Sequence, residues 1–541
     1  MHYGRKALAA GTAAALITAL LVAAEPAGAA DPRQALLDAA QPVRLGDVPA
    51  IDGKRVDVRK AAAGPQIIAD SPADDAATQP LVVDASPVRT RPVPSVKPVD
   101  PNGPNVSKDR IVMPAATTPN IPLLNTDGTI QAEAGGVVPD PNAAVGSTQI
   151  VETTNLFLKV RSKFLGGVQC QVGLNSFLGT GDILTDPRTQ FDTLNDRYVM
   201  VVTIQPTSPS AVPALWVAAT AGSDACGGWF AYRVPFPMII NGLMLDFPNV
   251  GQDRNAIIVT TNNFSKSENR IVNASVFALS KFGIYTGSLP AFTVFGVNKN
   301  TAPSLVAGAP ILSTAQTYLI SATPLLGYLL YSVTDPGTPF MTVSLIQFID
   351  AQYGNPSGLQ AQCNSPFGIN LSIEGGIDSA VIQTDQFLWF AHTALLGGFR
   401  TVVYGALRIS DGALFTSLAF HSGTSEDFNP SIGVGIFGPN LFFVYLNWAY
   451  VDRGAVPCQN ASATIATVLP NEGVPLVGGV DGTLASGGVV TSGSAFGDYS
   501  SVSIDPSPPG GCFAGSGVVT SQQYYDGSGQ WRSRLGRFCI A

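Results

Sequence analysis

One short phrase recurs along the chain and constrains its fold more than any other feature. Each copy begins with an Asp followed by Pro or a small or aromatic residue, and a strongly apolar segment follows about eight to fourteen residues later. Six copies start at Asp140, Asp186, Asp246, Asp378, Asp427 and Asp498, and a seventh, Ala309-Pro310-Ile311, lacks the Asp. The intervals of 46 to 71 residues leave room for four strands per copy. A unit of that size cannot bury its faces alone, so the units are expected to stack around an axis.

The apolar segments are short and rich in Val, Ile, Phe and Tyr. Examples are 198–202, 256–259, 387–390 and 441–445, each bounded by Gly, Asn, Asp or Pro. This pattern is typical of buried strands joined by turns. It predicts an all-β fold, and the seven units predict a seven-bladed β-propeller. Six blades, eight blades or two β-sandwiches are the alternatives.

The first thirty residues have the organisation of a secretory signal peptide. Arg5 and Lys6 precede an apolar run over 7–24, and small residues lead up to Asp31. The alternative is a membrane anchor, but the run holds many Ala, Gly and Thr residues and falls short of a membrane span. No later stretch is long and apolar enough to cross a bilayer. We therefore expect a secreted protein, located outside the cell, in the periplasm or in the cell envelope.

The next segment differs sharply in composition from the rest. No Phe, Tyr or Trp occurs between Asp31 and Leu156, and twelve prolines lie within 61–122. Proline supplies no amide donor, and a segment without aromatic residues buries little surface. The sequence predicts a disordered, Pro-rich arm over 31–125 and the propeller over 126–541. A strand-like arm lying on the main domain is the alternative.

Six cysteines follow the signal sequence, an even number in an oxidising compartment. None forms a C-x-x-C pair, so three disulfides are expected, with fifteen possible connectivities. Sequence proximity favours Cys170 with Cys226 and Cys512 with Cys539, which leaves Cys363 with Cys458.

Net charge narrows the choice of partner. The chain has 30 Lys and Arg against 38 Asp and Glu, a net charge of −8. Nucleic acid is excluded as a partner, because neutralising phosphates requires clustered basic residues. We expect a monomer that meets an extracellular glycan or polymer.

The repeated Asp is the most informative chemical feature. If it opens the innermost strand of each blade, several carboxylates surround one mouth of the channel. Such a group can bind Ca²⁺ through oxygen ligands, accept hydrogen bonds from sugar hydroxyls, or supply an acid and a base for glycoside cleavage. The alternative is structural, since Asp before Pro or Ser readily caps a turn. The predicted ligand-binding residues are Asp186, Asp246, Asp378, Asp427, Asp498 and Trp448.

Few other residues suggest chemistry. With only His392 and His421 after the signal sequence, a three-His zinc centre is excluded. His421 lies near Glu426 and Asp427 and is a candidate general base, with a surface histidine as the alternative; His392 follows an apolar run and is expected in the core. The catalytic candidates are Asp246, Asp427, Asp498 and His421.

Several phrases resemble those of secreted bacterial sialidase-like propellers that carry Asp-boxes. They are 246–251, 496–506 and 529–532. The segment 525–531 resembles a degenerate Asp-box, and 232–235 resembles the F/Y-R-I-P motif, whose arginine grips a carboxylate. The resemblance implies a propeller that acts on or binds glycans. It assigns no complete arginine triad and no Tyr–Glu nucleophile pair.

Two functions follow from these observations. The first is an extracellular propeller that binds a glycan or polymer at one channel mouth, with a cation as a possible aid. The alternative is a glycoside hydrolase or polysaccharide lyase that uses carboxylates at the same mouth. A fold alone does not decide between them.

Overall fold

The structure is a computed structural model that describes most of the chain. The described residues are 32–61, 90, 121–134, 138–208, 211–236, 242–265, 267–307, 316–324, 326–363, 365, 368–371, 375–377, 379, 381–438, 441–468, 480–488, 496–513 and 515–540. The predicted signal peptide and Asp378 lie outside them. The chain divides into two units between residues 41 and 42, and in the described part of the first, residues 32–41, the short helix α1 spans Pro32–Ala39.

In the second unit, neighbouring strands form antiparallel sets of four, and the last set takes its fourth strand, β4, from the segment before the first set. The first sets contain β5 (Asn142–Val145), β6 (Gln149–Thr153), β7 (Phe157–Ser162) and β8 (Val168–Gly173), then β9 (Ile183–Asp192), β10 (Arg197–Gln205), β11 (Ala214–Thr220) and β12 (Gly228–Pro235), then β13 (Met244–Gln252), β14 (Ala256–Ser265), β15 (Arg270–Ser280) and β17 (Phe292–Val297). The next are β18 (Thr301–Val306), β19 (Thr317–Thr323), β20 (Gly327–Thr334) and β21 (Thr342–Asp350), then β24 (Val381–Gln383), β25 (Phe387–Leu396), β26 (Phe399–Arg408) and β27 (Leu414–Ala419). The last are β28 (Ser425–Gly438), β29 (Leu441–Asp452), β30 (Gln459–Val468) and β31 (Val480–Gly487), then β32 (Ser501–Ile504), β33 (Val518–Tyr525), β34 (Trp531–Cys539) and β4 (Ile121–Ile130).

Shorter elements connect these sets. They are the helices α3 (Gln131–Ala134), α4 (Leu174–Leu178) and α5 (Lys281–Thr286), and the strands β1 (Val43–Val48), β2 (Ile51–Asp52), β3 (Lys54–Asp57), β16 (Ser288–Leu289), β22 (Gly358–Ala361) and β23 (Gly368–Leu371). Within the described residues, no helix is long and apolar enough to span a membrane.

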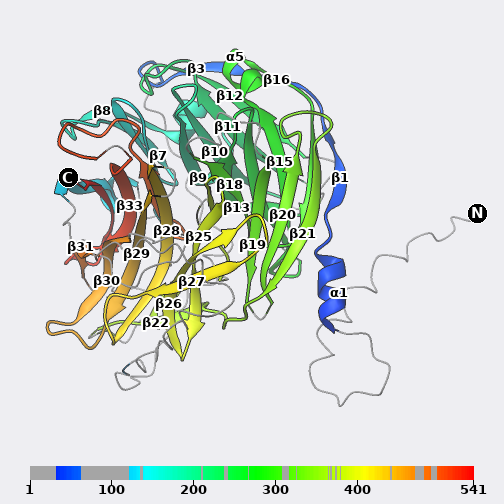
Figure 1. The fold of residues 1–541 in the computed structure, drawn as a ribbon. Helices are drawn as coiled ribbons and strands as arrows, with labels where there is room; N and C mark the ends of the chain where they lie inside the picture. The colour runs from blue at the N-terminus through cyan, green and yellow to red at the C-terminus, as the bar shows by residue number, and fades with distance from the viewer. Residues whose placement is uncertain are drawn as a thin grey trace, which may run out of the picture. The chain divides into compact units, whose positions relative to one another are not determined.

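The first strands of the sets form a closed series. β5 contacts β9, β9 contacts β13, and the contacts continue through β18, β24 and β28 to β32, which contacts β5. Figure 1 shows the result: the red strand β33 lies beside the cyan strands of the first set. Strands that surround an axis in this way are the organisation of a β-propeller. The all-β prediction is confirmed.

The predicted apolar segments occupy equivalent places in this arrangement. Each of 198–202, 256–259, 387–390 and 441–445 lies in the second strand of its set. These strands lie between two neighbours within the sheet, and other sheets cover both of their faces. Strand β14, for example, is buried over its whole length. Burial on both faces explains why these strands read as continuous apolar runs rather than as alternating patterns.

The recurring phrase corresponds to a β-bulge in the innermost strands. Asp186, Phe247 and Asn429 have φ values of 57°, 53° and 50°, each is followed by proline, and the strand pairing shifts register at each of them. Proline has no amide to donate, so a bulge, where pairing is interrupted, accommodates it. Asp140 (φ 43°) and Asn300 (φ 56°) hold the same left-handed conformation directly before β5 and β18. The predicted copy at 309–311 lies outside the described residues, and the left-handed residue before the first strand of the fourth set is Asn300.

The predicted arm is partly structured. β1 pairs with β17, β2 with β16 and β3 with β12, so residues 43–57 extend the outer edges of two sets. Disorder over 31–125 is thus wrong for these residues, which follow the strand-like alternative. Edge pairing uses backbone groups and needs no aromatic side chains. Residues 62–89 and 91–120 lie outside the described part. β4 begins at Ile121, so the last set takes in residues that the sequence assigned to the arm.

All six cysteines are paired as sequence proximity favoured. The disulfides are Cys170–Cys226, Cys363–Cys458 and Cys512–Cys539. The disulfide prediction is confirmed.

Candidate functional site

Four of the predicted aspartates converge where the innermost strands begin. Asp140, Asp186 and Asp246 are buried, and Asp498 is partly exposed. The ring of Tyr499 lies among them, within electrostatic reach of Asp186, Asp246 and Asp498. We call Asp140, Asp186, Asp246 and Asp498 the acidic cluster.

The acidic cluster is tied to backbone groups of neighbouring sets. Asp140 accepts the amide of Asp498 at 2.7 Å and the side-chain amide of Asn155 at 2.6 Å. Asn155 accepts the amide of Asp186 at 2.8 Å, and Asp186 accepts the amide of Phe247 at 3.1 Å. The carboxylates of Asp140 and Asp186 therefore cap amides of the adjacent sets and hold successive innermost strands together. Asp246 instead accepts the amide of the next residue in its own strand, Phe247, at 3.0 Å.

Burial and mutual repulsion shift the titration of these acids. Burial, followed by the carboxylate of Asp186, raises the pKa of Asp140 to about 7. Burial, followed by the carboxylate of Asp246 and a hydrogen bond to it, raises the pKa of Asp186 well above its usual range. Like charges at close range cannot all ionise, so one member of such a pair keeps its proton near neutral pH.

This coupling predicts a pH-dependent effect of Asp186→Asn. The side-chain amide introduced by this substitution resembles the protonated acid, because its oxygen can accept the backbone N–H of Phe247 and its nitrogen can donate to Asp246. In the wild type, the protonated Asp186 contributes stability in full below about pH 4, which is the pKa of an aspartate in the unfolded chain. This stability is lost as pH rises through the pKa of Asp186 in the folded protein. The variant should therefore gain stability relative to wild type as pH rises, by up to about 1.4 kcal/mol per pH unit.

Thermal unfolding of both proteins at pH 4.5, 6, 7.5 and 9 measures the effect. Asp411→Asn is the control, since Asp411 is exposed and paired with Arg408 at 2.6 Å. Parallel pH profiles for Asp186→Asn and wild type would contradict the prediction.

A polar pocket of about 120 Å³ adjoins the acidic cluster. Its lining includes Asp246, Asp498, Asn262, Phe247 and Arg270. Phe247 is partly exposed and its ring packs against Tyr499, with centroids 4.7 Å apart. Arg270 is exposed and paired with Glu268. We call this the mouth pocket.

The fixed amides of the mouth pocket come from two sets. Asn262 donates to Asn300 at 3.0 Å and accepts the amide of Asn300 at 2.8 Å, and Asn249 accepts from Arg188 at 3.0 Å. The guanidinium of Arg188 lies 4.3 Å from the ring centroid of Tyr499. The pocket thus presents carboxylates, amides and an aromatic ring held by a rigid network.

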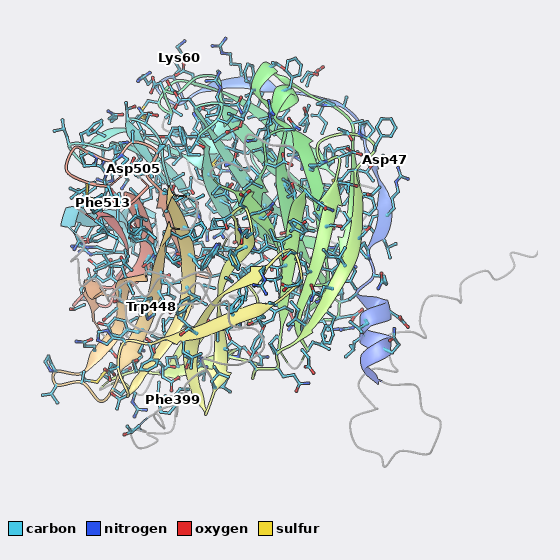
Figure 2. All side chains as sticks on the ribbon, viewed as in Figure 1. Asp47, Lys60, Phe399, Trp448, Asp505 and Phe513 are labelled. Atoms are coloured by element: carbon cyan, nitrogen blue, oxygen red, sulfur yellow. A yellow bond between two sulfur atoms is a disulfide. The ribbon has the colours of Figure 1, made fainter. Side chains whose placement is uncertain are left out.

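Asp427 and Trp448 do not belong to the acidic cluster, and the structure does not fit their predicted role as ligand-binding residues. Asp427 is fully buried and accepts the indole N–H of Trp448 at 3.0 Å and the backbone amide of His421 at 2.8 Å. Trp448 is buried among β28–β30 (Figure 2), so it cannot stack on a sugar. The ring of His421 stacks on Tyr450 with centroids 3.8 Å apart. His421 and Asp427, both predicted as catalytic candidates, therefore pack with Tyr450 and Trp448 and do not belong to the acidic cluster.

The two motifs that resemble sialidase sequences also fall outside the acidic cluster. Arg233 lies on β12 and forms a salt bridge with Asp182 at 3.1 Å, so its guanidinium binds a carboxylate of its own chain. In the Asp-box-like turn, Asp526 accepts the amides of Ser528 and Gln530 and binds Arg532. Both motifs have structural partners.

The remaining predictions concern His392 and calcium. His392 is fully buried and bonded to Tyr328 at 2.8 Å, as expected of a core histidine, and burial lowers its pKa to about 4. Among the described residues, no group of three or more His, Cys, Asp or Glu side chains is arranged to hold a metal ion.

Sequence reasoning missed the polar residues that clamp the bulges. Asn155, Asn262 and Thr393 each accept the backbone amide of the left-handed residue in the following set. Asn155 and Thr393 stand fifteen residues after Asp140 and Asp378, and Asn262 stands sixteen residues after Asp246. A polar residue at about this spacing after the phrase is the signal that could have pointed to them.

Comparisons with known proteins place this geometry in context. No family model matches the sequence, and no curated protein matches it. Solved structures with similar folds include the phage phi92 endosialidase (8% identity, 78% of this chain and 69% of that chain, TM-score 0.36) and the Trypanosoma rangeli sialidase in complex with sialic acid (10%, 73% and 59%, 0.35). An exo-β-1,3-galactanase from Clostridium thermocellum is similar too (12%, 74% and 95%, 0.30). Because these TM-scores lie below 0.5, we take neither substrate nor activity from them.

Proposed function

We propose that this chain is a secreted, seven-bladed β-propeller that binds a neutral glycan at the mouth pocket without cleaving it. The blade count is supported by the seven sets of four strands and by the closed series of their first strands. Secretion is supported by the three disulfides, which form in oxidising compartments.

The single observation that carries the proposal is the lining of the mouth pocket. Carboxylates of Asp246 and Asp498 accept hydrogen bonds from sugar hydroxyls, and asparagine amides supply both donors and acceptors. The partly exposed ring of Phe247 offers an apolar face to sugar C–H groups. Small-molecule sites combine an apolar surface with a few fixed polar groups in this way.

The charges of the same pocket favour a neutral sugar over an acidic one. Two of its side chains are carboxylates, and its one arginine, Arg270, is already paired with Glu268. An acidic sugar would meet repulsion from Asp246 and Asp498.

Binding is favoured over hydrolysis by the contact between the two most closely coupled acids. Asp186 is hydrogen-bonded to Asp246. Glycosidases instead hold two carboxyl groups about 5 to 9 Å apart, with the sugar or a water between them. Asp186 and Asp246 therefore form a shared-proton pair that supports the pocket.

A glycan array with the full chain, combined with a reducing-end assay on the glycans that bind, tests this proposal. We expect saturable binding to neutral glycans and no release of reducing ends. Asp246→Asn should weaken binding about tenfold or more, because hydrogen bonds to charged groups contribute about 1.5 to 3 kcal/mol. Asp411→Asn is the matched control. Binding to acidic glycans alone, or turnover of a bound glycan, would contradict the proposal.

A further inference from the structure

Strand direction gives the closed series of sets two ends, and exposed phenylalanines gather at one of them. The acidic cluster lies where the innermost strands begin, so these strands end at the opposite face, and so do the third strands of the sets. α5 lies at this end, at the top of Figure 1. We call the surface formed by the loops 163–167, 281–287, 335–341 and 505–513 the distal face.

Each of these four loops exposes a phenylalanine. Phe282 and Phe340 are each 78% exposed, Phe164 is 60% exposed and Phe513 is 45% exposed. Among the described residues one other phenylalanine is exposed, Phe420, and it follows β27 at the end where the mouth pocket lies. Exposed apolar side chains that are concentrated on one face mark a surface that contacts another body.

The exposed rings are held in place by anchored neighbours. Met341, which follows Phe340, is buried. The amide of Phe513 donates to the carbonyl of Ile540 at 2.9 Å, and Cys512 beside it forms a disulfide with β34. Rings that are presented by fixed loops lose little conformational freedom on binding, which favours their use as contacts.

The charges beside the other two rings favour an uncharged surface over an anionic one. Lys163 and Lys281 directly precede the exposed phenylalanines of their loops. Both are buried, and they pair with Asp505 and Asp192, each at 2.8 Å. Neither lysine therefore offers its charge to the surroundings, and the chain as a whole has a net charge of −8. Attraction to anionic lipids depends on exposed Lys and Arg.

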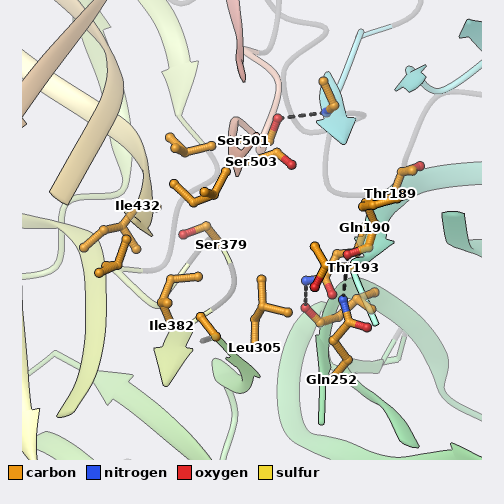
Figure 3. Close-up of a pocket in the computed structure, with 18 of the residues that line it drawn as sticks. Thr189, Gln190, Thr193, Gln252, Leu305, Ser379, Ile382, Ile432, Ser501 and Ser503 are labelled. Carbon is orange, nitrogen blue, oxygen red and sulfur yellow. Dashed lines mark hydrogen bonds between the residues drawn. The ribbon is translucent and has the colours of Figure 1, made fainter. Parts of the chain in front are cut away.

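The four phenylalanines form two pairs that are separated by the channel between the innermost strands. The first and seventh sets are neighbours because β5 contacts β32, and the third and fourth sets are neighbours because β13 pairs with β18. The cavity between the innermost strands has a volume of about 290 Å³, and its lining includes the polar residues Thr193 and Ser503 (Figure 3). The rings thus surround a partly polar centre and do not form one continuous apolar patch.

This arrangement fits a bilayer better than a folded partner. A protein interface has a continuous apolar core within a polar rim, whereas the distal face has its apolar groups around a partly polar centre. A bilayer is a continuous fluid surface that takes up apolar side chains at separate points, and binding strengthens with the apolar area that is buried.

We propose that the distal face docks on a phospholipid bilayer and that Phe164, Phe282, Phe340 and Phe513 insert into its interface. Zwitterionic lipids are sufficient for this binding. The mouth pocket lies at the other end of the innermost strands and stays accessible. Docking on a bilayer is independent of the proposed glycan binding.

Flotation of the full chain with phosphatidylcholine vesicles tests the proposal. We expect the wild type to float with the vesicles. The double variant Phe282→Ser/Phe340→Ser should lower the partition coefficient about a hundredfold, because burial of each phenylalanine contributes about tenfold or more. Phe420→Ser is the matched control and should bind like wild type. The apolar run over 7–24 is present in all three proteins, so their differences report the exposed phenylalanines. Added phosphatidylglycerol should not strengthen binding.

Two tryptophan variants locate the contact. Phe340→Trp keeps an aromatic ring and should bind like wild type, and brominated phosphatidylcholine should quench its fluorescence more than that of the wild type. Phe420→Trp should show no such extra quenching. The proposal is overturned if phosphatidylcholine vesicles are not bound, if binding requires anionic lipid, if Phe282→Ser/Phe340→Ser floats like wild type, or if both tryptophans are quenched equally. It is also overturned if light scattering shows a dimer that the double variant dissociates, since the distal face would then be a protein interface.

Discussion

A chain that begins at residue 132 is expected to lose its cooperative unfolding transition, whereas a chain that begins at residue 119 keeps it. The two differ in β4, which completes the last set by pairing with β34. β4 also joins the first set, because Thr129 donates to Glu152 at 3.2 Å and Lys159 donates to the carbonyl of Gly128 at 3.1 Å. Without β4 the last set loses its fourth strand and the hydrogen bonds that this strand makes with the first set.

The expected loss is on the order of 5 kcal/mol or more, comparable with the whole free energy of unfolding of many domains. Circular dichroism during thermal and urea unfolding measures it. Both chains lack β1–β3, so the strands that pair with β12 and β17 do not contribute to the difference. Equal midpoints for the two chains would show that β4 does not close the fold.

The second large effect is expected for Asp505→Ala. Asp505 and Lys163 are fully buried, and Arg537 nearly so, and the carboxylate is the partner of both cations. Arg537 also donates to the carbonyl of Lys163 at 2.9 Å, so the cluster joins the first set to the last. Removing the carboxylate leaves two buried cations uncompensated, which costs about 3 to 5 kcal/mol.

Urea unfolding of Asp505→Ala and wild type measures this cost. Asp411→Ala removes the exposed partner of Arg408 and should change stability by less than about 1 kcal/mol. A similar small effect for both variants would contradict the role assigned to the buried cluster.

The fold could be anticipated because two independent signals agreed. Apolar runs such as 256–259 predict buried strands, and the recurring phrase gives their number and spacing. In the fourth set Asn300-Thr301 stands where the first two sets have Asp140-Pro141 and Asp186-Pro187, so the phrase was not recognised there, although Asn also favours the left-handed conformation. The strands in 43–57 were missed because edge pairing depends on backbone groups, and these leave no aromatic or apolar pattern in the sequence.

The site was anticipated in part, and the errors have a structural reason. The phrase was aligned on its Asp, but the shared structural feature is the left-handed residue of the bulge. Asp140 and Asp186 hold that position, whereas in the sixth set Asn429 holds it. Asp427 stands two residues earlier, opposite Tyr450 in regular pairing, and is therefore buried. The mouth pocket itself combines side chains that only the closed ring brings together, so no local pattern predicts it.

Calorimetric titration with a neutral glycan selected on the array tests the central claim most directly. The comparison is between wild type, Asp498→Asn and the exposed control Asp411→Asn. Glycan binding at the mouth pocket predicts that Asp498→Asn raises the Kd about tenfold or more while Asp411→Asn leaves it unchanged. An unchanged Kd for Asp498→Asn, with the thermal transition intact, would contradict the claim.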